Sequence, residues 1–366
     1  MTGARFPLWR VVPPVALLVA VVAFATAGSL HLPAPLAVAW PPLELAVLTG
    51  AVFAAVHHAD VIAHRTGEPY GTLVLTVAVT VIEVSLIVSI MLAGDGSPTL
   101  ARDTVFAVVM LVCNGLVGLC LVFGGLKYGE QGFRVTGASA YLVVLMPLAT
   151  LTLILPSHTT SAPGPFYTAP QVLFIGAATL ALYGVFLYVQ TVRHRDYFLS
   201  DAAKAPAGAE HPPPTAGAVW ESAGLLLMSL TAVVLLAKSF ADSVKTAVAA
   251  LGAPVAVIGL LVALLVLLPE TLAALRAARR DELQKSLNLA LGSSLATIGL
   301  TIPAVAALSV IVDRPLALGL EAIDAILLAL TFGVSLVTFG AGRTNILPGF
   351  VHLVLFATFV FLVFAP

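Results

Sequence analysis

The sequence predicts an all-α polytopic membrane protein with about eleven transmembrane helices. Hydrophobic residues make up 60% of the 366-residue chain and charged residues only 10%, whereas about a quarter of the residues in a soluble domain are charged. Apolar runs of about 20 residues, long enough to cross a bilayer as a helix, recur from end to end. Because these runs are continuous and do not alternate with polar residues, they indicate helices and not the strands of a membrane β-barrel.

Eleven windows of the sequence have the length and hydropathy of a membrane-spanning helix. The first window follows Arg5 and Arg10 and ends near the small residues Ala25–Ala27. A cleaved signal peptide is therefore the alternative to a first transmembrane helix. The windows cover residues 11–29, 36–56, 71–93, 104–126, 138–156, 169–192, 218–237, 252–275, 286–311, 317–340 and 348–365.

The distribution of lysine and arginine predicts the orientation of these helices. With the N-terminus in the cytoplasm, 13 of the 17 basic residues fall in loops on the cytoplasmic side and 4 fall in the opposite loops. Cytoplasmic loops carry the excess of basic residues in membrane proteins. We therefore expect a multi-pass protein of the inner (plasma) membrane with a cytoplasmic N-terminus and an outer C-terminus.

The longest polar connection divides the predicted helices after the first into two groups of five. This segment, residues 193–217, is rich in proline, alanine and glycine, which indicates a flexible cytoplasmic linker. Because each group has an odd number of helices, the second group enters the membrane from the opposite side, as in inverted-repeat transporters. The predicted domains are an N-terminal transmembrane helix at 1–30, a first repeat at 31–192, the linker at 193–217 and a second repeat at 218–366.

A single carboxylate, Glu83, lies near the middle of the apolar run 73–92. A charge at the centre of a bilayer costs roughly 2.5–3.5 kcal/mol on insertion scales, so an acid there indicates a function. At 100° per residue, Thr76, Thr80 and Glu83 share one face of the helix. We predict that Glu83 and Thr80 bind a cation or a proton. For the threonine, the alternative is a hydrogen bond to a carbonyl of its own helix.

A second glutamate, Glu270, occupies the second span of the second repeat, as Glu83 does in the first. Pro269 precedes it and has no N–H, so the carbonyl of Leu265 loses its usual helical donor. Carboxylate and carbonyl oxygens are the ligands that hard cations prefer. Glu83 and Glu270 are therefore the predicted metal- and proton-binding pair, with the Leu265 carbonyl as a further ligand. The alternative is an ordinary proline kink beside a glutamate that a neighbour satisfies.

Polar residues on the spans after the two acids are further candidate ligands. Asn114 lies at the centre of the span after Glu83, and Ser293 and Thr297 lie one turn apart in the span after Glu270. Small polar residues also allow helices to pack closely, and this alternative applies to the serine and the threonine.

The stretch "HHADVIAHRTGEPYG", residues 57–71, is expected at a cytoplasmic helix end and loop. His57, His58, Asp60 and Glu68 are candidate pH-sensing or entrance residues, because histidine titrates near neutral pH and carboxylates attract cations. The alternative is placement at the surface among lipid headgroups. For Asp324, near the start of the tenth span, solvation at the membrane interface is the expected role.

The sequence lacks the patterns of several other functional classes. It has no glycine-rich phosphate loop, no basic cluster for nucleic acid and no nucleophile–base set of an enzyme. No spacing of histidines and carboxylates indicates a fixed metal site, and no cofactor is expected. Cys113 and Cys120 are expected to be buried thiols, because a seven-residue spacing on one helix does not allow a disulfide. We expect a transporter whose partners are small cations and the lipid bilayer.

Several motifs, taken in order, resemble the calcium/cation antiporter superfamily. The family's glycine-led helix with a glutamate matches "GTLVLTVAVTVIEVSLI" (Gly71–Ile87), and its second signature matches "APVAVIGLLVALLVLLPE" (Ala253–Glu270) followed by "GSSLATIGLTIP". The segments "GGLKYGEQGF" and "GRTNILPG" match further family motifs. The resemblance covers roughly residues 50–366 and points to the bacterial ChaA-type calcium/proton antiporters, which share the "HADV-AHR-GEPYG" stretch and the proline before the second glutamate.

This resemblance implies a secondary antiporter that exports Ca²⁺ in exchange for H⁺ by alternating access. ChaA-type relatives are also associated with sodium/proton and potassium/proton exchange, so Na⁺ and K⁺ are further expected substrates. Plant and fungal exchangers carry Gly-Asn before each acid, whereas this chain has Val79-Thr80 and Leu267-Leu268. With fewer amide ligands, a monovalent-cation/proton antiporter without Ca²⁺ transport stays open as an alternative. The second alternative is a cation channel, since channels also line their pores with acidic residues.

Overall fold

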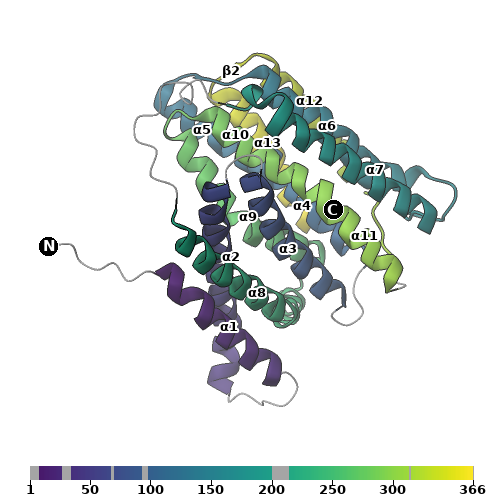
Figure 1. The fold of residues 1–366 in the computed structure, drawn as a ribbon. Helices are drawn as coiled ribbons and strands as arrows, with labels where there is room; N and C mark the ends of the chain where they lie inside the picture. Colours follow the sequence, from purple (N-terminus) through teal and green to yellow (C-terminus); the bar gives the residue numbers. More distant parts are fainter. Residues whose placement is uncertain are drawn as a thin grey trace. The chain divides into compact units, whose positions relative to one another are not determined.

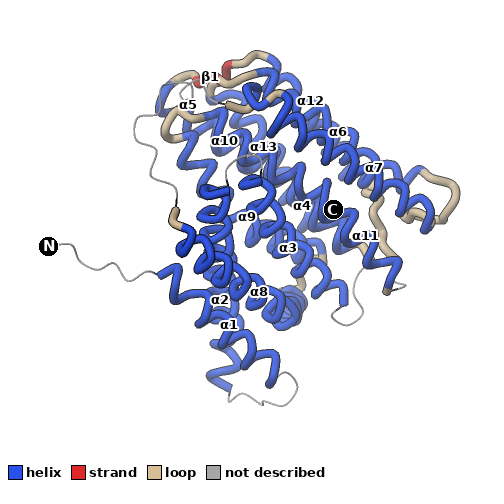
Figure 2. The backbone as a smooth tube through the Cα atoms, in the orientation of Figure 1, coloured by secondary structure: helices blue, strands red, loops and turns tan. Residues whose placement is uncertain are grey.

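The protein is almost entirely helical in its computed structural model, which describes residues 8–26, 34–66, 70–92, 98–199, 214–312 and 315–365. Figure 2 shows helices throughout this part of the chain, with short strands as the exception. Ten of the described helical segments are long and apolar enough to cross a membrane, and Val74–Ser89 is a shorter apolar segment. The prediction of an all-α membrane protein with about eleven spans is confirmed.

The chain forms two compact units, and each is described by itself. Unit 1 consists of Met1–Gly96 and His211–Leu251, and unit 2 consists of Ser97–Glu210 and Gly252–Pro366. The predicted repeats do not coincide with these units. Each repeat is one continuous stretch of sequence, whereas each unit combines two stretches that pack together. The predicted domain boundaries therefore stay a prediction.

Four helices make up the described part of unit 1. They are α1 (Leu8–Thr26), α2 (Ala34–Thr66), α3 (Tyr70–Leu92) and α8 (Ala216–Ala250). Helices α2 and α8 pack against each other, and both contact α1 and α3 (Figure 1). At 1.5 Å per residue, the 33 residues of α2 and the 35 residues of α8 each span about 50 Å. Both are therefore longer than the hydrocarbon core of a bilayer, which is about 30 Å thick.

The two long helices continue past the ends that hydropathy predicts. The predicted windows end at residues 56 and 237, whereas α2 ends at Thr66 and α8 at Ala250. Hydropathy marks where apolar residues stop, but a helix continues through polar residues that are adequate helix formers. His57, His58 and Asp60 consequently lie within the last three turns of α2, at the helix end and not in the loop that follows.

Unit 2 contains the other described spans, and four of these contain a π-helical segment. A π-helix is a wider turn that interrupts regular α-helical hydrogen bonding and is frequent at functional sites. In chain order the elements are α4 (Leu100–Met110), η1 (Leu111–Leu116), α5 (Val117–Tyr128), β1 (Gln131–Gly132), α6 (Val135–Ala149), η2 (Thr150–Ile154), η3 (Leu155–His158), α7 (Ala169–Tyr188), η4 (Val189–Arg193), η5 (Arg195–Tyr197), α9 (Ala256–Ala278), α10 (Leu283–Ala296), η7 (Thr297–Thr301), α11 (Ile302–Ile311), α12 (Ala322–Gly340), β2 (Arg343–Thr344) and α13 (Ile346–Phe364).

The helices that carry the two predicted acids match in length and in the type of span after them. Helices α3 and α9 both have 23 residues, and Glu83 and Glu270 are the fourteenth and fifteenth residues of their helices. The next span after each helix has 29 residues, Leu100–Tyr128 or Leu283–Ile311, with a π-helix inside it. Two such series in the same order are consistent with two five-helix repeats, which an odd number of helices makes inverted.

A short strand pair fixes the loop after α5 against the end of α9. Strand β1 pairs antiparallel with β2. The side chain of Gln131 donates from Nε2 to the carbonyl oxygen of Ala278 at 3.1 Å and to Oδ1 of Asp281 at 2.8 Å. Gln131 is buried, so these hydrogen bonds hold the C-terminal end of the helix that carries Glu270.

Helix α9 approaches α4 most closely at Gly259. A Cβ atom placed on Gly259 would lie 2.9 Å from the carbonyl carbon of Asp103 and 2.9 Å from the backbone nitrogen of Thr104. These are backbone atoms of α4, so they cannot turn away as a side chain can. Glycine at this position therefore sets the distance between the two helices.

We expect Gly259→Ala to lower the thermal stability of the purified protein by about 1–3 kcal/mol, because the added methyl group forces α4 and α9 apart. Gly333→Ala is the matched control, since a Cβ on Gly333 of α12 meets nothing within 4 Å. The melting temperature of each variant is measured in detergent, with size-exclusion chromatography as the readout of unfolding. Equal melting temperatures for Gly259→Ala and the wild type would show that the helices adjust without cost.

Candidate functional site

Glu270 follows Pro269 inside a helix that does not break at the proline. Helix α9 is continuous from Ala256 to Ala278, and Glu270 is half-buried. Leu265 is buried one turn before Pro269, and its carbonyl cannot accept a hydrogen bond from the proline nitrogen. A carboxyl group and a carbonyl without its usual helical donor thus belong to the same stretch of α9.

The predicted ligands Ser293 and Thr297 lie on the helix that packs directly against α9. Ser293 is half-buried on α10, and Thr297 is buried at the first position of the π-helix η7. Helix α10 contacts α9 and η1. The structure therefore places Leu265, Glu270, Ser293 and Thr297 on two contacting helices of unit 2.

Asn114 is fully buried inside the π-helix η1, where it links three spans of unit 2. Its Nδ2 donates to Oγ1 of Thr331 on α12 at 2.9 Å, and its Oδ1 lies 3.0 Å from Nδ1 of His352 on α13. The other ring nitrogen of His352, Nε2, lies 3.1 Å from Oγ1 of Thr338. An amide oxygen only accepts, so Nδ1 of His352 carries the hydrogen. In the neutral ring, Nε2 then accepts from the hydroxyl of Thr338.

Of this network, Asn114 is a candidate ligand predicted from the sequence, and His352 is not. Thr331 and Thr338 belong to one polar stripe on α12, but His352 is isolated in the apolar run of α13. The signal that could have found it is the one that identifies Glu83, an ionisable residue inside an otherwise apolar span.

Both the nitrogen and the oxygen of the Asn114 side-chain amide form hydrogen bonds in this network. The Nδ2 group is used by Thr331, and one lone pair of Oδ1 is used by His352. An amide oxygen has a second lone pair, through which Asn114 could also contact a cation. The role of Asn114 as a ligand stays a prediction, and its orientation is fixed by its neighbours.

In unit 1, Glu83 is buried in α3, which packs against both long helices. Its side chain is 2% exposed, and Thr80 is half-buried three positions earlier on the same helix. Helix α3 contacts α2 and α8. Glu83 and Thr80 stay predicted ligands, placed within unit 1.

The adjacent histidines of α2 connect this helix to α1 and α8. His58 is buried, with Nε2 at 2.8 Å from the carbonyl oxygen of Trp9 and Nδ1 at 3.3 Å from Oγ of Ser222. His57 stacks on Trp9, with the ring centroids 5.0 Å apart. These contacts give both histidines a structural part in unit 1, beside the predicted sensing role.

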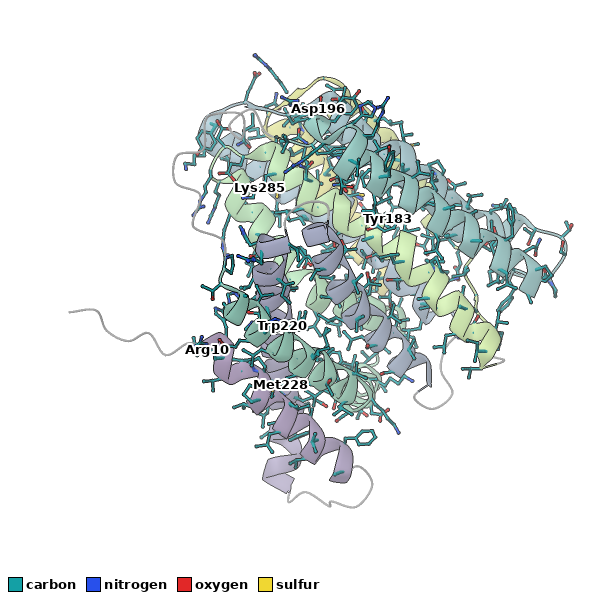
Figure 3. All side chains as sticks on the ribbon, viewed as in Figure 1. Arg10, Tyr183, Asp196, Trp220, Met228 and Lys285 are labelled. Atoms are coloured by element: carbon teal, nitrogen blue, oxygen red, sulfur yellow. The ribbon has the colours of Figure 1, made fainter. Side chains whose placement is uncertain are left out.

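Charged groups surround the same end of unit 1. Figure 3 shows Arg10 of α1 and Trp220 of α8 near each other, and Arg10 forms an ion pair with the adjacent Glu221 at 2.6 Å. Asp60 is exposed on α2. Glu68 lies outside the residues that the structure describes. Polar and charged side chains thus gather where α2 ends and α8 begins.

Unit 2 has an acidic pocket of about 170 Å³ between the starts of α4, α9 and α12 and the end of α13. Asp103, Glu321 and Asp324 line it, and the buried Arg102 is held by Asp103 at 2.8 Å and by the carbonyl of Gly319. Among the described residues, no group of three or more His, Cys, Asp or Glu side chains is arranged to hold a metal ion. The pocket is an acidic recess at the ends of four spans of unit 2.

Comparison with known proteins identifies relatives along the whole chain. The sequence matches the family described as "Sodium/calcium exchanger protein" over residues 37–192 and 221–365. It is 48% identical to the protein y4hA of Sinorhizobium fredii over 369 residues, which is 100% of this chain and 98% of that protein. It is 38% identical to the sodium-potassium/proton antiporter ChaA of Escherichia coli K12 over 333 residues, 90% of each chain.

Solved structures at low sequence identity share the fold. Native YfkE aligns with a TM-score of 0.71 at 15% identity, over 98% of this chain and all of YfkE. The H⁺/Ca²⁺ exchanger CAX aligns with a TM-score of 0.68 at 13% identity, over 96% of this chain and 87% of CAX. With a family match over both halves and two relatives above 30% identity, the chain belongs to the sodium/calcium exchanger family of membrane cation antiporters, in its ChaA-type group.

Proposed function

We propose that this chain is a proton-coupled antiporter of the inner membrane that exports Ca²⁺, and also Na⁺ or K⁺, in exchange for H⁺. The observation that carries the proposal is the pair of acids, Glu83 and Glu270, at equivalent places in the matching helices α3 and α9. The relative ChaA is named as a sodium-potassium/proton antiporter, and YfkE as a Ca²⁺/H⁺ antiporter. Both names support exchange of a cation against protons.

Two carboxylates are sufficient to couple the two fluxes. Ionised carboxylates are costly in a low-dielectric interior. A transporter in which both acids are ionised and unoccupied therefore rarely switches between its inward-open and outward-open states. Two protons or one divalent cation neutralise the pair. Because only the neutralised carrier alternates its access, each Ca²⁺ that leaves is matched by two H⁺ that enter.

Uncharged oxygens complete the cation site in this proposal. The hydroxyl of Thr80 is the further ligand beside Glu83. The carbonyl of Leu265 and the hydroxyls of Ser293 and Thr297 are the further ligands beside Glu270. Asn114 contributes the free lone pair of Oδ1. Such oxygens replace the water that a hard cation loses when it enters the protein.

The sidedness of the transporter is also part of the proposal. The excess of basic residues in one set of loops supports a cytoplasmic N-terminus and an outer C-terminus. His57, His58 and Asp60 then lie toward the cytoplasmic entrance, and the sequence predicts the same side for Glu68. The acidic pocket around Asp324 faces the outside, where it attracts cations to unit 2.

A monovalent-cation/proton antiporter without Ca²⁺ transport is the second candidate function. The 38% identity to ChaA, whose name includes only sodium and potassium, favours it. The two functions differ in whether Ca²⁺ alone drives proton movement.

Everted membrane vesicles that contain the protein distinguish these functions. Respiration acidifies the vesicles and quenches an acridine dye, and Ca²⁺, Na⁺ or K⁺ is then added separately. We expect each transported cation to release protons and restore the fluorescence. Vesicles without the protein are the control. Proton movement without any counter-cation would indicate a channel, and no response to any of the three cations would refute the proposal.

A further inference from the structure

Unit 1 contains another buried acid, Glu44, which the proposed exchange cycle does not use. Glu44 is the eleventh residue of α2, and its side chain is 0% exposed. Glu44 lies thirteen positions before His57, which corresponds to about 20 Å along the helix axis. Glu44 therefore lies toward the opposite end of unit 1 from the histidines.

The carboxyl group of Glu44 has a hydrogen-bond donor on one oxygen only. Its Oε2 accepts a hydrogen bond from Oγ of Ser243 on α8 at 2.8 Å, whereas its Oε1 is buried and has no hydrogen-bond partner. Ser239, one turn earlier on α8, is a second hydrogen-bonding neighbour of the carboxyl group. A buried carboxylate oxygen without a donor is costly while the group is ionised, and a proton on that oxygen removes the charge.

Among the described residues, no ion pair with this carboxyl group is present. Helix α1 carries Arg10, at the end where His57 and His58 lie, and α3 carries Glu83. The charged side chains of α8 are Glu221, Lys238, Asp242 and Lys245. Among these groups, the acid Asp242 directly precedes Ser243, the residue that donates to Glu44.

A short polar path connects Glu44 to the surface of unit 1. Ser243, which donates to the carboxyl group, is only half-buried, and the adjacent Asp242 is exposed. A hydroxyl group both donates and accepts hydrogen bonds, so Ser243 can pass a proton between the acid and water. The path opens near the end of α8.

We propose that Glu44 is a proton-binding site, which takes up and releases H⁺ through Ser243 at the outer end of the α2–α8 pair. The proposal rests on the proton-coupled function above and adds a third acid to it. A proton on Glu44 keeps the α2–α8 contact neutral, and its release places a charge between the two long helices of unit 1. Glu44 thereby sets the pH range in which the transporter works.

Infrared difference spectroscopy of the reconstituted protein, between acid and alkaline pH, tests the site directly. The carboxyl C=O band that disappears on deprotonation should lose one component in Glu44→Gln, because glutamine keeps the shape and accepts from Ser243 but does not titrate. Ser243→Ala should move that component, since one hydrogen bond to the carboxyl group is gone. Glu221→Gln, at an exposed acid paired with Arg10, is the matched control and should leave it unchanged.

The vesicle assay separates a proton site from a simple link between helices. We expect Glu44→Gln to retain cation-driven proton movement and to shift the pH midpoint of its rate by roughly half a unit or more. Identical infrared spectra for the wild type and Glu44→Gln would overturn the proposal, and so would an unchanged pH profile. The infrared result does not depend on transport, so it stands apart from any failure of the antiporter function.

Discussion

Replacing Glu270 or Glu83 with glutamine is expected to abolish cation-driven proton movement in everted vesicles while the protein stays folded. Glutamine has nearly the size of the acid and its polarity, but it neither releases a proton nor balances a cation. Each variant therefore behaves as if one acid were permanently protonated. Each variant lacks one of the two carboxylates that the proposed cycle must ionise and neutralise, so the exchange rate should fall on the order of 100-fold or more, which corresponds to about 3 kcal/mol.

The matched control is Glu221→Gln, which removes an exposed acid in an ion pair with Arg10. An exposed pair contributes little, about 0–1 kcal/mol, so this variant should transport like the wild type. Size-exclusion profiles show whether each variant is folded. Wild-type transport by either Glu83→Gln or Glu270→Gln would refute the assignment of that acid.

The fold could be predicted from the sequence because spans in a bilayer must be apolar for their whole length. Hydropathy could not give the ends of α2 and α8, since both helices continue through polar residues such as His58 and Asp242. The π-helices η1 and η7 were also absent from the prediction. A π-helix depends on how its span packs against neighbouring spans, and amino-acid composition does not predict that packing.

The predicted site residues are those whose chemistry contrasts with an apolar surrounding. Glu83 and Glu270 stand out for this reason, and Asn114 does so less strongly. Glu44 does not, because it follows Trp40, Pro41 and Pro42 near the start of a span, where an acid is expected to meet water. Its carboxyl group contacts Ser243 of α8, which lies 199 residues later in the chain. Burial of that kind comes from tertiary packing, which one sequence does not reveal.

His352→Gln is expected to weaken cation binding more than His352→Asn, although both remove the ring. The amide nitrogen of asparagine can take the place of Nδ1 and still donate to Asn114, whereas glutamine reaches toward the position of Nε2 and Thr338. In His352→Gln, Oδ1 of Asn114 loses its donor, and the amide is free to turn. A buried group left without its partner costs about 1–3 kcal/mol, so the half-saturating cation concentration should rise about tenfold, which corresponds to about 1.4 kcal/mol.

The pair of variants separates positioning of Asn114 from general damage to α13. Both variants place an amide of similar polarity in the same buried space, and asparagine, which is one methylene shorter, fills less of it. A loss of packing alone would therefore affect His352→Asn at least as much as His352→Gln. Dye dequenching at graded cation concentrations gives the half-saturating value, and thermal unfolding gives the stability. A higher half-saturating value in His352→Gln alone would assign the effect to the hydrogen bond on Asn114. Equal values in both variants would show that His352 acts through packing, and Asn114 would then lose its place in the proposed cation site.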